Sequence, residues 1–134
     1  MADRLQFELV SPERLLISRD VGMVVVPGAE GDFGVLPDHA PLISTVRPGV
    51  IDVYDDGVAI SDRIFVSGGF AEVTGERCTV LAEQATPLAE IDRAGTQAQL
   101  EQLQRDLGAA GDDGARERIA VQIETAEAKL AAAG

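Results

Sequence analysis

The change in residue pattern at Pro87 constrains the fold of this chain more than any other feature. Before Pro87, apolar residues occur in short runs separated by Gly, Pro and Asp, which is typical of β-strands and tight turns. After Pro87, Ala, Gln, Glu, Leu and Arg dominate and apolar residues recur at helical spacing. We therefore predict a β-domain over residues 1–86 and a helical unit over residues 87–134.

The first part reads as a series of short strands. Leu5, Phe7 and Leu9 alternate with polar neighbours, which is the period-2 pattern of a half-buried strand. Asp55-Asp56-Gly57 and Gly68-Gly69 are typical turn sequences between later runs. Close and regular spacing of such runs favours an antiparallel sandwich or barrel. The further runs are Leu15–Ile17, Val24–Val26 (ended by Pro27-Gly28), Pro41–Val46, Val50–Tyr54, Val58–Ile60, Ile64–Val66, Phe70–Val73 and Cys78–Ala82.

The second part reads as two amphipathic helices joined by a short Gly/Asp turn. Gly108 is the expected end of the first helix, and Asp112 or Asp113 is available to cap the second. Two such helices should pair as an antiparallel hairpin. The apolar stripes are Ile91, Ala94, Ala98, Leu100, Leu103 and Leu107 in the first helix, and Ile119, Ile123, Ala126 and Leu130 in the second. Gly95 should weaken the first helix, and Glu101 with Arg105 is a candidate i, i+4 ion pair.

The net charge of −12 excludes whole classes of partner. Acidic side chains outnumber basic ones on both sides of Pro87, so we expect neither nucleic-acid binding nor insertion into lipid. The first residues lack the apolar run of a signal peptide, and no stretch has the roughly 20 apolar residues of a membrane span. These features predict a soluble protein that attracts basic protein surfaces.

The candidate catalytic and ligand-binding residues are few. Cys78 is the single cysteine and is expected to be buried and inert. The triplet Gly28-x-x-Gly31-x-x-Gly34 lacks the Lys and the following helix of a phosphate-binding loop, which favours a turn with positive φ angles. His39 is the single histidine, and one imidazole with no cysteine in the same loop gives little support for a zinc site. We expect no catalytic residue, no metal and no cofactor.

The segment from Gly28 to Leu42 is unusually apolar for a region rich in turn residues. It contains Phe33, Val35, Leu36, Pro37 and Pro41. Two interpretations stay open: these side chains fill the interior, or some of them form an exposed patch that contacts another protein.

Two blocks of sequence make a more specific resemblance. The segment from Val26 to Leu42 (VPGAEGDFGVLPDHAPL) resembles the characteristic loop of the epsilon subunit of the bacterial F-type ATP synthase. The segment from Val66 to Val73 (VSGGFAEV) is similar to the second recurrent block of that family. Pro48-Gly49 and the run Val80–Ala82 follow the order expected for the family, and the similarity extends from about Leu5 to the end of the chain.

The resemblance implies a fold, a location and partners. The implied fold is a β-sandwich of about ten antiparallel strands followed by a C-terminal antiparallel helical hairpin. The implied function is that of a non-catalytic central-stalk (rotor) subunit in ATP synthesis and hydrogen ion transport. It would bind the gamma subunit and the membrane c-ring at the cytoplasmic face of the bacterial inner membrane, as a peripheral protein. By position, the acidic loop with Glu30, Asp32 and Phe33 would meet the c-ring, and Ser11, His39 and Ser44 would lie on the gamma-facing side.

The helical hairpin departs from the family pattern. Some members bind ATP there through an Ile/Leu-Asp-x-x-Arg-Ala motif, but this chain has Ile91-Asp92-Arg93-Ala94 without the two intervening residues. We therefore expect no ATP site, and at most weak regulation of ATP hydrolysis by the hairpin. Whether the hairpin is folded or extended stays open.

Two other functions compete with the rotor interpretation. A free-standing β-sandwich adaptor for peptide or sugar would need an aromatic platform, which a chain without Trp hardly supplies. A small hydrolase would use His39 with Asp32 or Asp38.

Overall fold

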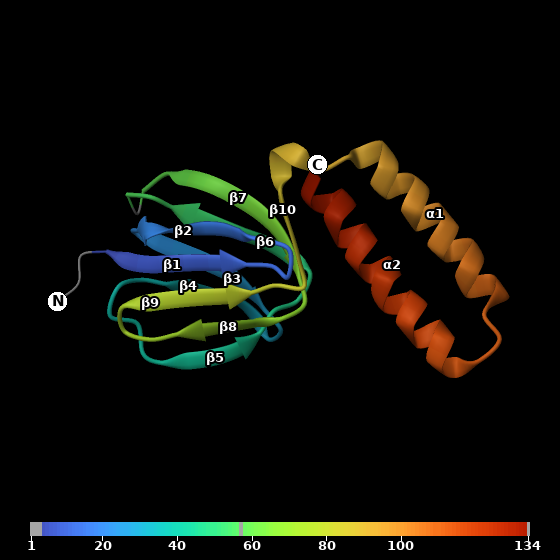
Figure 1. Cartoon of the computed structure of the whole chain (residues 1–134), viewed down its shortest axis with the longest axis horizontal. Coiled ribbons are helices and arrows are strands. Elements are labelled where there is room, and N and C mark those ends of the chain that lie inside the picture. Colours follow the sequence, from blue (N-terminus) through green and yellow to red (C-terminus); the bar gives the residue numbers. More distant parts are fainter. Residues whose placement is uncertain (1–3, 57, 134) are drawn as a thin grey trace. The chain divides into compact units, whose positions relative to one another are not determined.

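The computed structural model describes residues 4–56 and 58–133 (Figure 1). By their backbone contacts, the residues separate into two compact units, Met1–Pro87 and Leu88–Gly134. The last strand of the first unit ends at Pro87, and the first helical turn of the second unit begins at Leu88.

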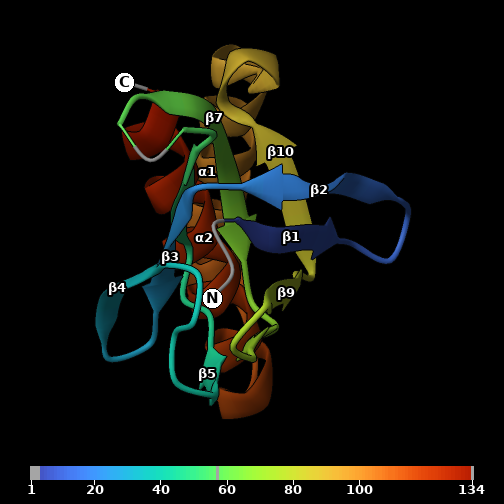
Figure 2. The ribbon, with the colours of Figure 1, turned by 90° about the vertical axis from the view of Figure 1, so that its left-hand side faces the viewer.

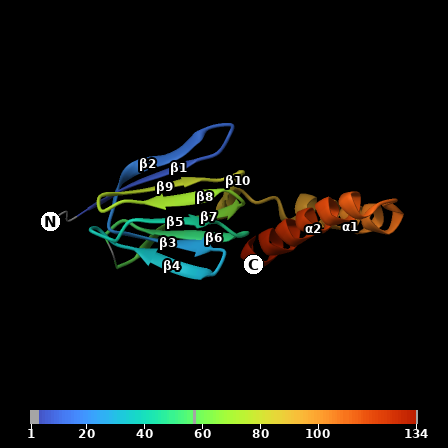
Figure 3. The same ribbon diagram turned by 90° about the horizontal axis from the view of Figure 1, so that it is seen from below.

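The first unit is a β-sandwich, as the sequence predicts. Its ten strands form two five-stranded sheets, in the orders β2-β1-β9-β8-β5 (the first sheet) and β10-β7-β6-β3-β4 (the second sheet), and Figure 3 shows the two layers. The strands are β1 (Leu5–Val10), β2 (Leu15–Val21), β3 (Met23–Gly28), β4 (Gly31–Val35), β5 (Leu42–Thr45), β6 (Gly49–Tyr54), β7 (Ile60–Ser67), β8 (Phe70–Val73), β9 (Arg77–Leu81) and β10 (Gln84–Pro87). The pairing is antiparallel except between β1 and β9, which run parallel. Parallel neighbours need a crossover connection, and here the chain between β1 and β9 passes through the second sheet and back.

Alternating side chains of the two sheets meet in one aliphatic core. In β1, Leu5, Phe7 and Leu9 are fully buried, which confirms the period-2 prediction. Burial of this apolar surface is the main favourable term in folding the sandwich. The core also contains Val21, Val24, Val26, Val35, Val46, Ile51, Val53, Ile64, Val66, Ala71, Val73, Cys78, Val80 and Ala82.

Cys78 is an inert core residue, and its chemistry is testable. Burial raises the pKa of the Cys78 thiol from 9.0 to about 12. At pH 8 this lowers the reactive thiolate fraction by roughly a thousandfold. We expect the folded protein to resist a thiol reagent at pH 8 and the protein in guanidinium to react at once. Reaction of the folded protein at the rate of a free thiol would contradict the burial.

The same pKa difference sets the sign of a pH effect. The unfolded thiol loses its proton near pH 9, whereas the folded thiol keeps it up to about pH 12. The contribution of Cys78 to stability is therefore constant below pH 8 and is lost as the pH rises through that window.

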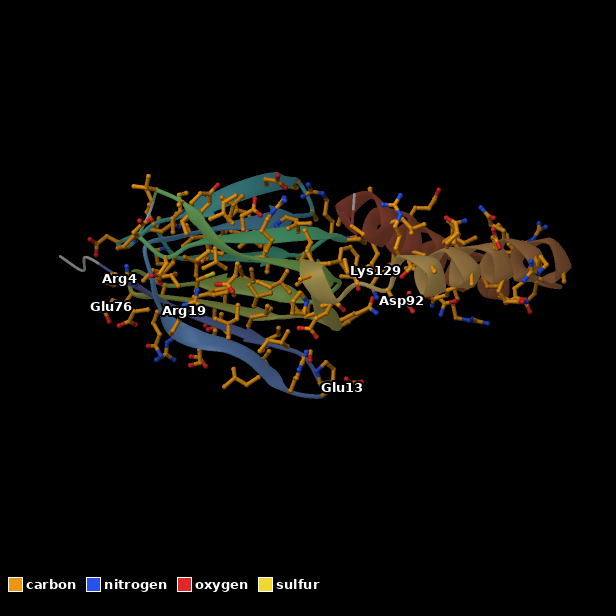
Figure 4. The ribbon with its side chains drawn as sticks, turned by 90° about the horizontal axis from the view of Figure 1, so that it is seen from above. Arg4, Glu13, Arg19, Glu76, Asp92 and Lys129 are labelled. Carbon is orange, nitrogen blue, oxygen red and sulfur yellow. The ribbon has the colours of Figure 1, made fainter. Side chains whose placement is uncertain are left out.

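The sandwich has two ends. One end holds Arg4 and the β4–β5 and β8–β9 connections, and we call it the Arg4 end; Figure 2 views the strands from this side. The other end holds the β1–β2 and β3–β4 turns, and we call it the Glu30 end. Figure 4 shows the separation, with Arg4 and Glu76 at the first end and Glu13 at the second.

Two strand boundaries differ from the prediction. Pro27 and Gly28 do not end the Val24 run, since β3 continues through Gly28 and pairs with Gly31 of β4. Val58 is 84% exposed and precedes β7, which is a single strand from Ile60 to Ser67 instead of two short ones. Gly57 of the predicted Asp55–Gly57 turn lies outside the described residues.

The second unit is a helical hairpin. A short 3-10 turn, η1 (Leu88–Glu90), precedes α1 (Arg93–Ala109) and α2 (Asp113–Ala133), and the two helices pack against each other. The first helix ends one residue beyond Gly108, and Asp112 caps the second by accepting the Ala115 amide at 2.7 Å. None of the described helices has the length and apolarity of a membrane span.

The contact stripe of the first helix differs from the prediction. Ala94 and Ala98 are exposed, whereas Thr96 and Leu100 are buried, so the stripe begins at Thr96 and continues through Leu103 and Leu107. The predicted stripe of the second helix is correct: Ile119, Ile123 and Leu130 are half-buried and Ala126 is buried. The predicted pair of Glu101 with Arg105 does not form; the Arg105 guanidinium donates to Gln102 at 2.8 Å.

Candidate interaction surface

An apolar row crosses the outer face of the first sheet. One residue from each of the five strands stands in register, and four of the five are apolar. The order is Thr45, Phe70, Leu81, Val10 and Leu15. Phe70, Leu81 and Leu15 are 56%, 53% and 55% exposed. Their neighbours along each strand face the core, so alternation directs these side chains outward. An exposed row of largely apolar side chains is typical of a surface that contacts another molecule.

Two further features extend the apolar row. Ile43 of β5 is 71% exposed and faces the same side as Thr45, two residues further along that strand. Val10, Pro12 and Leu81 line a shallow apolar hollow at the Glu30 end, together with Ser11. Ser11 therefore borders the apolar row, although its own side chain donates weakly to the Arg14 carbonyl at 3.4 Å.

The acidic segment with Glu30 and Asp32 forms a tight hairpin of β3 and β4 at the Glu30 end, and we call it the Glu30 hairpin. Gly28 pairs with Gly31, and only Ala29 and Glu30 lie between them. Gly31 has φ +137°, which a residue with a side chain rarely adopts. Gly28 needs no positive φ, but a Cβ there would come within 2.8 Å of the Gly31 carbonyl oxygen. The expected positive φ therefore applies to Gly31 alone of the three glycines.

Arg47 ties this hairpin to the β5–β6 connection. Its guanidinium donates to the Gly28 carbonyl at 2.8 Å and to the Asp32 carboxylate at 2.6 Å. Its backbone amide donates to the Pro27 carbonyl at 3.0 Å. Glu30, in contrast, forms no ion pair within the described residues.

The apolar residues from Gly28 to Leu42 are divided: some fill the interior and others are exposed, as the two interpretations of the sequence had it. Val35 is buried and Phe33 packs partly against the core, so these two fill the interior. Leu36 is 54% exposed and Pro41 is exposed. The segment is also not a single loop, because its residues Gly31–Val35 form β4.

His39 lies at the Arg4 end, away from the Glu30 hairpin. Its ring nitrogen Nδ1 is 2.7 Å from the Ala40 carbonyl, and its amide donates to the Leu36 carbonyl at 3.1 Å. Asp38, with φ +67°, donates its amide to the Gly75 carbonyl at 2.7 Å.

Ser44 is half-buried and lies in β5 opposite buried Ala71. Its hydroxyl donates to the Thr45 carbonyl at 3.0 Å. The structure thus brings Ser11 near the apolar row. Ser44 precedes Thr45 in β5, but strand alternation turns its side chain to the core-facing side, and His39 lies at the other end.

The structure does not support the hydrolase alternative in which His39 acts with Asp32. Asp32 lies near the start of β4 and His39 follows its far end, and Asp32 is paired with Arg47. Among residues 4–56 and 58–133, no group of three or more His, Cys, Asp or Glu is placed to hold a metal ion.

An aromatic platform for an adaptor does not form either. Phe7 and Phe65 are fully buried, and Phe33 and Tyr54 are half-buried. Phe70 alone of the five aromatic side chains is exposed, and it belongs to the apolar row, where its neighbours are not aromatic.

The apolar row itself is what the sequence interpretation missed. Its signal was present in the run Val80–Ala82, where Leu81 is apolar at a position between two inward-facing residues. A strand with one face in water should be polar there. The alternation alone did not reveal that apolar residues of four strands stand in register.

The fold places the chain among proteins in which a ten-stranded β-sandwich precedes a helical hairpin. The family described as "ATP synthase, Delta/Epsilon chain, beta-sandwich domain" matches residues 4–88. An ATP synthase epsilon chain from Rhodospirillum centenum is 56% identical over 134 residues, covering 97% of this chain and 92% of that protein. One from Rhodospirillum rubrum is 53% identical over 132 residues, covering 98% of each. The chain therefore belongs to the ATP synthase epsilon chain family, as the resemblance of its two sequence blocks indicated.

Solved structures agree with this membership. A chain in the Euglena gracilis mitochondrial ATP synthase (OSCP/F1/c-ring, rotational state 1) has a TM-score of 0.84 and 26% identity, covering 100% of this chain and 84% of that one. A chain in the Tetrahymena thermophila mitochondrial ATP synthase (central stalk and c-ring) has a TM-score of 0.68 and 13% identity, covering 97% and 96%, which shows a shared fold.

Proposed function

We propose that this chain is a non-catalytic central-stalk subunit that links the gamma subunit to the c-ring and couples proton flow to ATP synthesis. The observation that carries the proposal is the apolar row Thr45-Phe70-Leu81-Val10-Leu15 on the outer face of the first sheet. Membership of the epsilon chain family supports the choice of these partners.

The apolar row is assigned to the gamma subunit. Protein interfaces concentrate their binding energy in a few exposed aromatic and aliphatic anchors, and Phe70 with Leu81 and Leu15 fits that description. Of the residues expected on the gamma side, Ser11 borders the row, whereas Ser44 precedes Thr45 in β5 with its side chain on the core-facing side. His39 at the Arg4 end is proposed as a peripheral contact of the same partner.

The Glu30 hairpin is assigned to the c-ring. Its tip is exposed, acidic and fixed by the register of Gly28 with Gly31. An acidic tip suits polar c-ring loops that carry basic residues. The two contacts together would hold the chain at the cytoplasmic face of a bacterial inner membrane, as a peripheral subunit and with no insertion into lipid.

The helical hairpin is proposed as an accessory. The Asp92 carboxylate, which belongs to the shortened nucleotide motif, accepts the Gly95 amide at 3.0 Å and caps α1. A Cβ on Gly95 would stand 2.5 Å from the Asp92 carboxylate, so this glycine makes room for the cap and does not interrupt the middle of the helix. Asp92 therefore serves the helix, and we propose no ATP site here.

Membranes depleted of their epsilon chain test this function. We expect the full chain to restore proton-coupled ATP synthesis, and a chain lacking residues 88–134 to restore it largely as well. The reason is that the buried core cluster lies entirely within Leu5–Ala82. A failure of the full chain to restore synthesis would reject the coupling role. Restoration by the full chain but not by the truncation would reject only the accessory role of the hairpin.

A further inference from the structure

The two acids of the Glu30 hairpin differ in their surroundings. The Asp32 carboxylate is paired with the Arg47 guanidinium at 2.6 Å, so its charge is balanced within the chain. Glu30, at the tip, has no such partner among the described residues. A partner that approaches this tip would therefore meet one uncompensated carboxylate and not two.

The hairpin tip is also held more firmly than a surface turn requires. Gly28 bridges to Val46 of the β5–β6 connection, and the Ala29 amide donates to the Thr45 carbonyl at 2.9 Å. Arg47 adds a backbone bond to Pro27 and side-chain bonds to Gly28 and Asp32. The guanidinium thus spans both strands of the hairpin, since Gly28 ends β3 and Asp32 belongs to β4.

We propose that Arg47 is a positioning residue: it locks the β3–β4 hairpin and neutralises Asp32, so that Glu30 alone presents negative charge to a basic or N–H-donating loop of the c-ring. This inference rests on the proposed function. It assigns separate roles to Glu30 and Asp32, which the sequence analysis had placed together in the contact with the c-ring. The planar guanidinium suits the task, because it can donate to a carbonyl and a carboxylate at once, whereas an ammonium group is a single point of charge.

The Arg47–Asp32 pair does little for global stability. Its side chains are 42% and 61% exposed, and exposed ion pairs contribute about 0–1 kcal/mol. Removing Arg47 should therefore loosen the hairpin without unfolding the sandwich. Arg63 with Asp52, paired at 2.8 Å on the outer face of the second sheet, is a matched control away from the tip.

A double-mutant cycle in the assembled synthase tests the proposal. The affinity of each full-length variant is measured by titrating it into epsilon-depleted synthase membranes and following restored ATP synthesis. We expect Arg47→Ala to weaken binding about fivefold, and Glu30→Gln to weaken it by a similar factor, as for neighbouring coupled residues. In the Glu30→Gln background, the further loss from Arg47→Ala should be less than about twofold. Arg63→Ala should leave the affinity unchanged.

A local readout in the free chain accompanies the cycle. Hydrogen exchange of the Ala29 amide should be at least about threefold faster in Arg47→Ala and unchanged in Arg63→Ala. If Arg47→Ala lowers the folded fraction, Asp32→Asn replaces it in the same cycle, with the same expected loss of coupling to Glu30.

The outcomes separate the positioning role from the function beneath it. If the wild-type chain does not restore synthesis, the proposed function fails, and the inference fails with it. Two results would overturn the inference while the function stands, provided that the wild-type chain restores synthesis. Either Arg47→Ala has no effect on binding, or it weakens binding by the same factor in the wild-type and Glu30→Gln backgrounds. Either result would mean that Arg47 does not act through Glu30.

Discussion

Replacing Gly69 with Ala is expected to destabilise the sandwich by at least about 3 kcal/mol. Gly69 has φ +90°, and a Cβ there would stand 1.8 Å from the Leu81 carbonyl oxygen. The residue lies in the turn from β7 to β8, where the chain passes from the second sheet to the first, and its carbonyl accepts the Val46 amide at 3.1 Å. Backbone, not a flexible side chain, blocks the space, so relief requires the turn itself to move.

Gly75→Ala is the matched control. Gly75 lies in another turn of the sandwich, between β8 and β9; its φ is not positive, and an added methyl group would meet no atom within 4 Å. Its replacement should change the free energy of unfolding by less than about 0.5 kcal/mol. Guanidinium unfolding of both variants measures the difference. Equal stabilities would show that the β7–β8 turn is not constrained as described.

Replacing Phe70 with Ala is expected to weaken binding of the gamma subunit by at least about 30-fold, equivalent to about 2 kcal/mol. Phe70 occupies the second strand of the apolar row, with Leu81 and Thr45 in register on either side. Its side chain is 56% exposed in the free chain, so an interface has most of its surface still to bury. For the same reason, the free energy of unfolding should fall by less than about 1 kcal/mol.

Val58→Ala controls for exposed apolar area as such. Val58 is 84% exposed in the β6–β7 connection and is not part of the apolar row. Its truncation should leave gamma binding unchanged. Titration calorimetry of both variants against the purified gamma subunit provides the comparison. A Phe70→Ala variant that binds as tightly as the wild-type chain would exclude the first sheet as the docking face.

The fold could be predicted because local and global patterns agree. Leu5, Phe7 and Leu9 alternate, and they are buried on one face. Helical spacing after Pro87 likewise predicted both helices. The predicted end of the strand before Pro27 was wrong, because Pro-Gly after an apolar run is typical of a turn, whereas β3 continues through Gly28.

The site could be predicted only in part, because its parts come together through cross-strand register. Glu30 was recognised from its sequence block, and its exposed position at the hairpin tip fits the proposed contact. Phe70 and Leu81 are eleven residues apart, and only the β8–β9 pairing places them side by side. Arg47 and Asp32 meet across the β3–β4 and β5–β6 segments in the same way. The placement of His39 at the Arg4 end separates it from Ser11, which sequence position alone did not reveal.

The proposed stalk function depends above all on association of this chain with the purified gamma subunit. We predict a stable one-to-one complex in size-exclusion chromatography with light scattering, and loss of that complex for the double variant of Phe70→Ala and Leu81→Ala. A wild-type chain that elutes alone at micromolar concentrations, or a double variant that still elutes with gamma, would contradict the proposed docking of gamma on the apolar row.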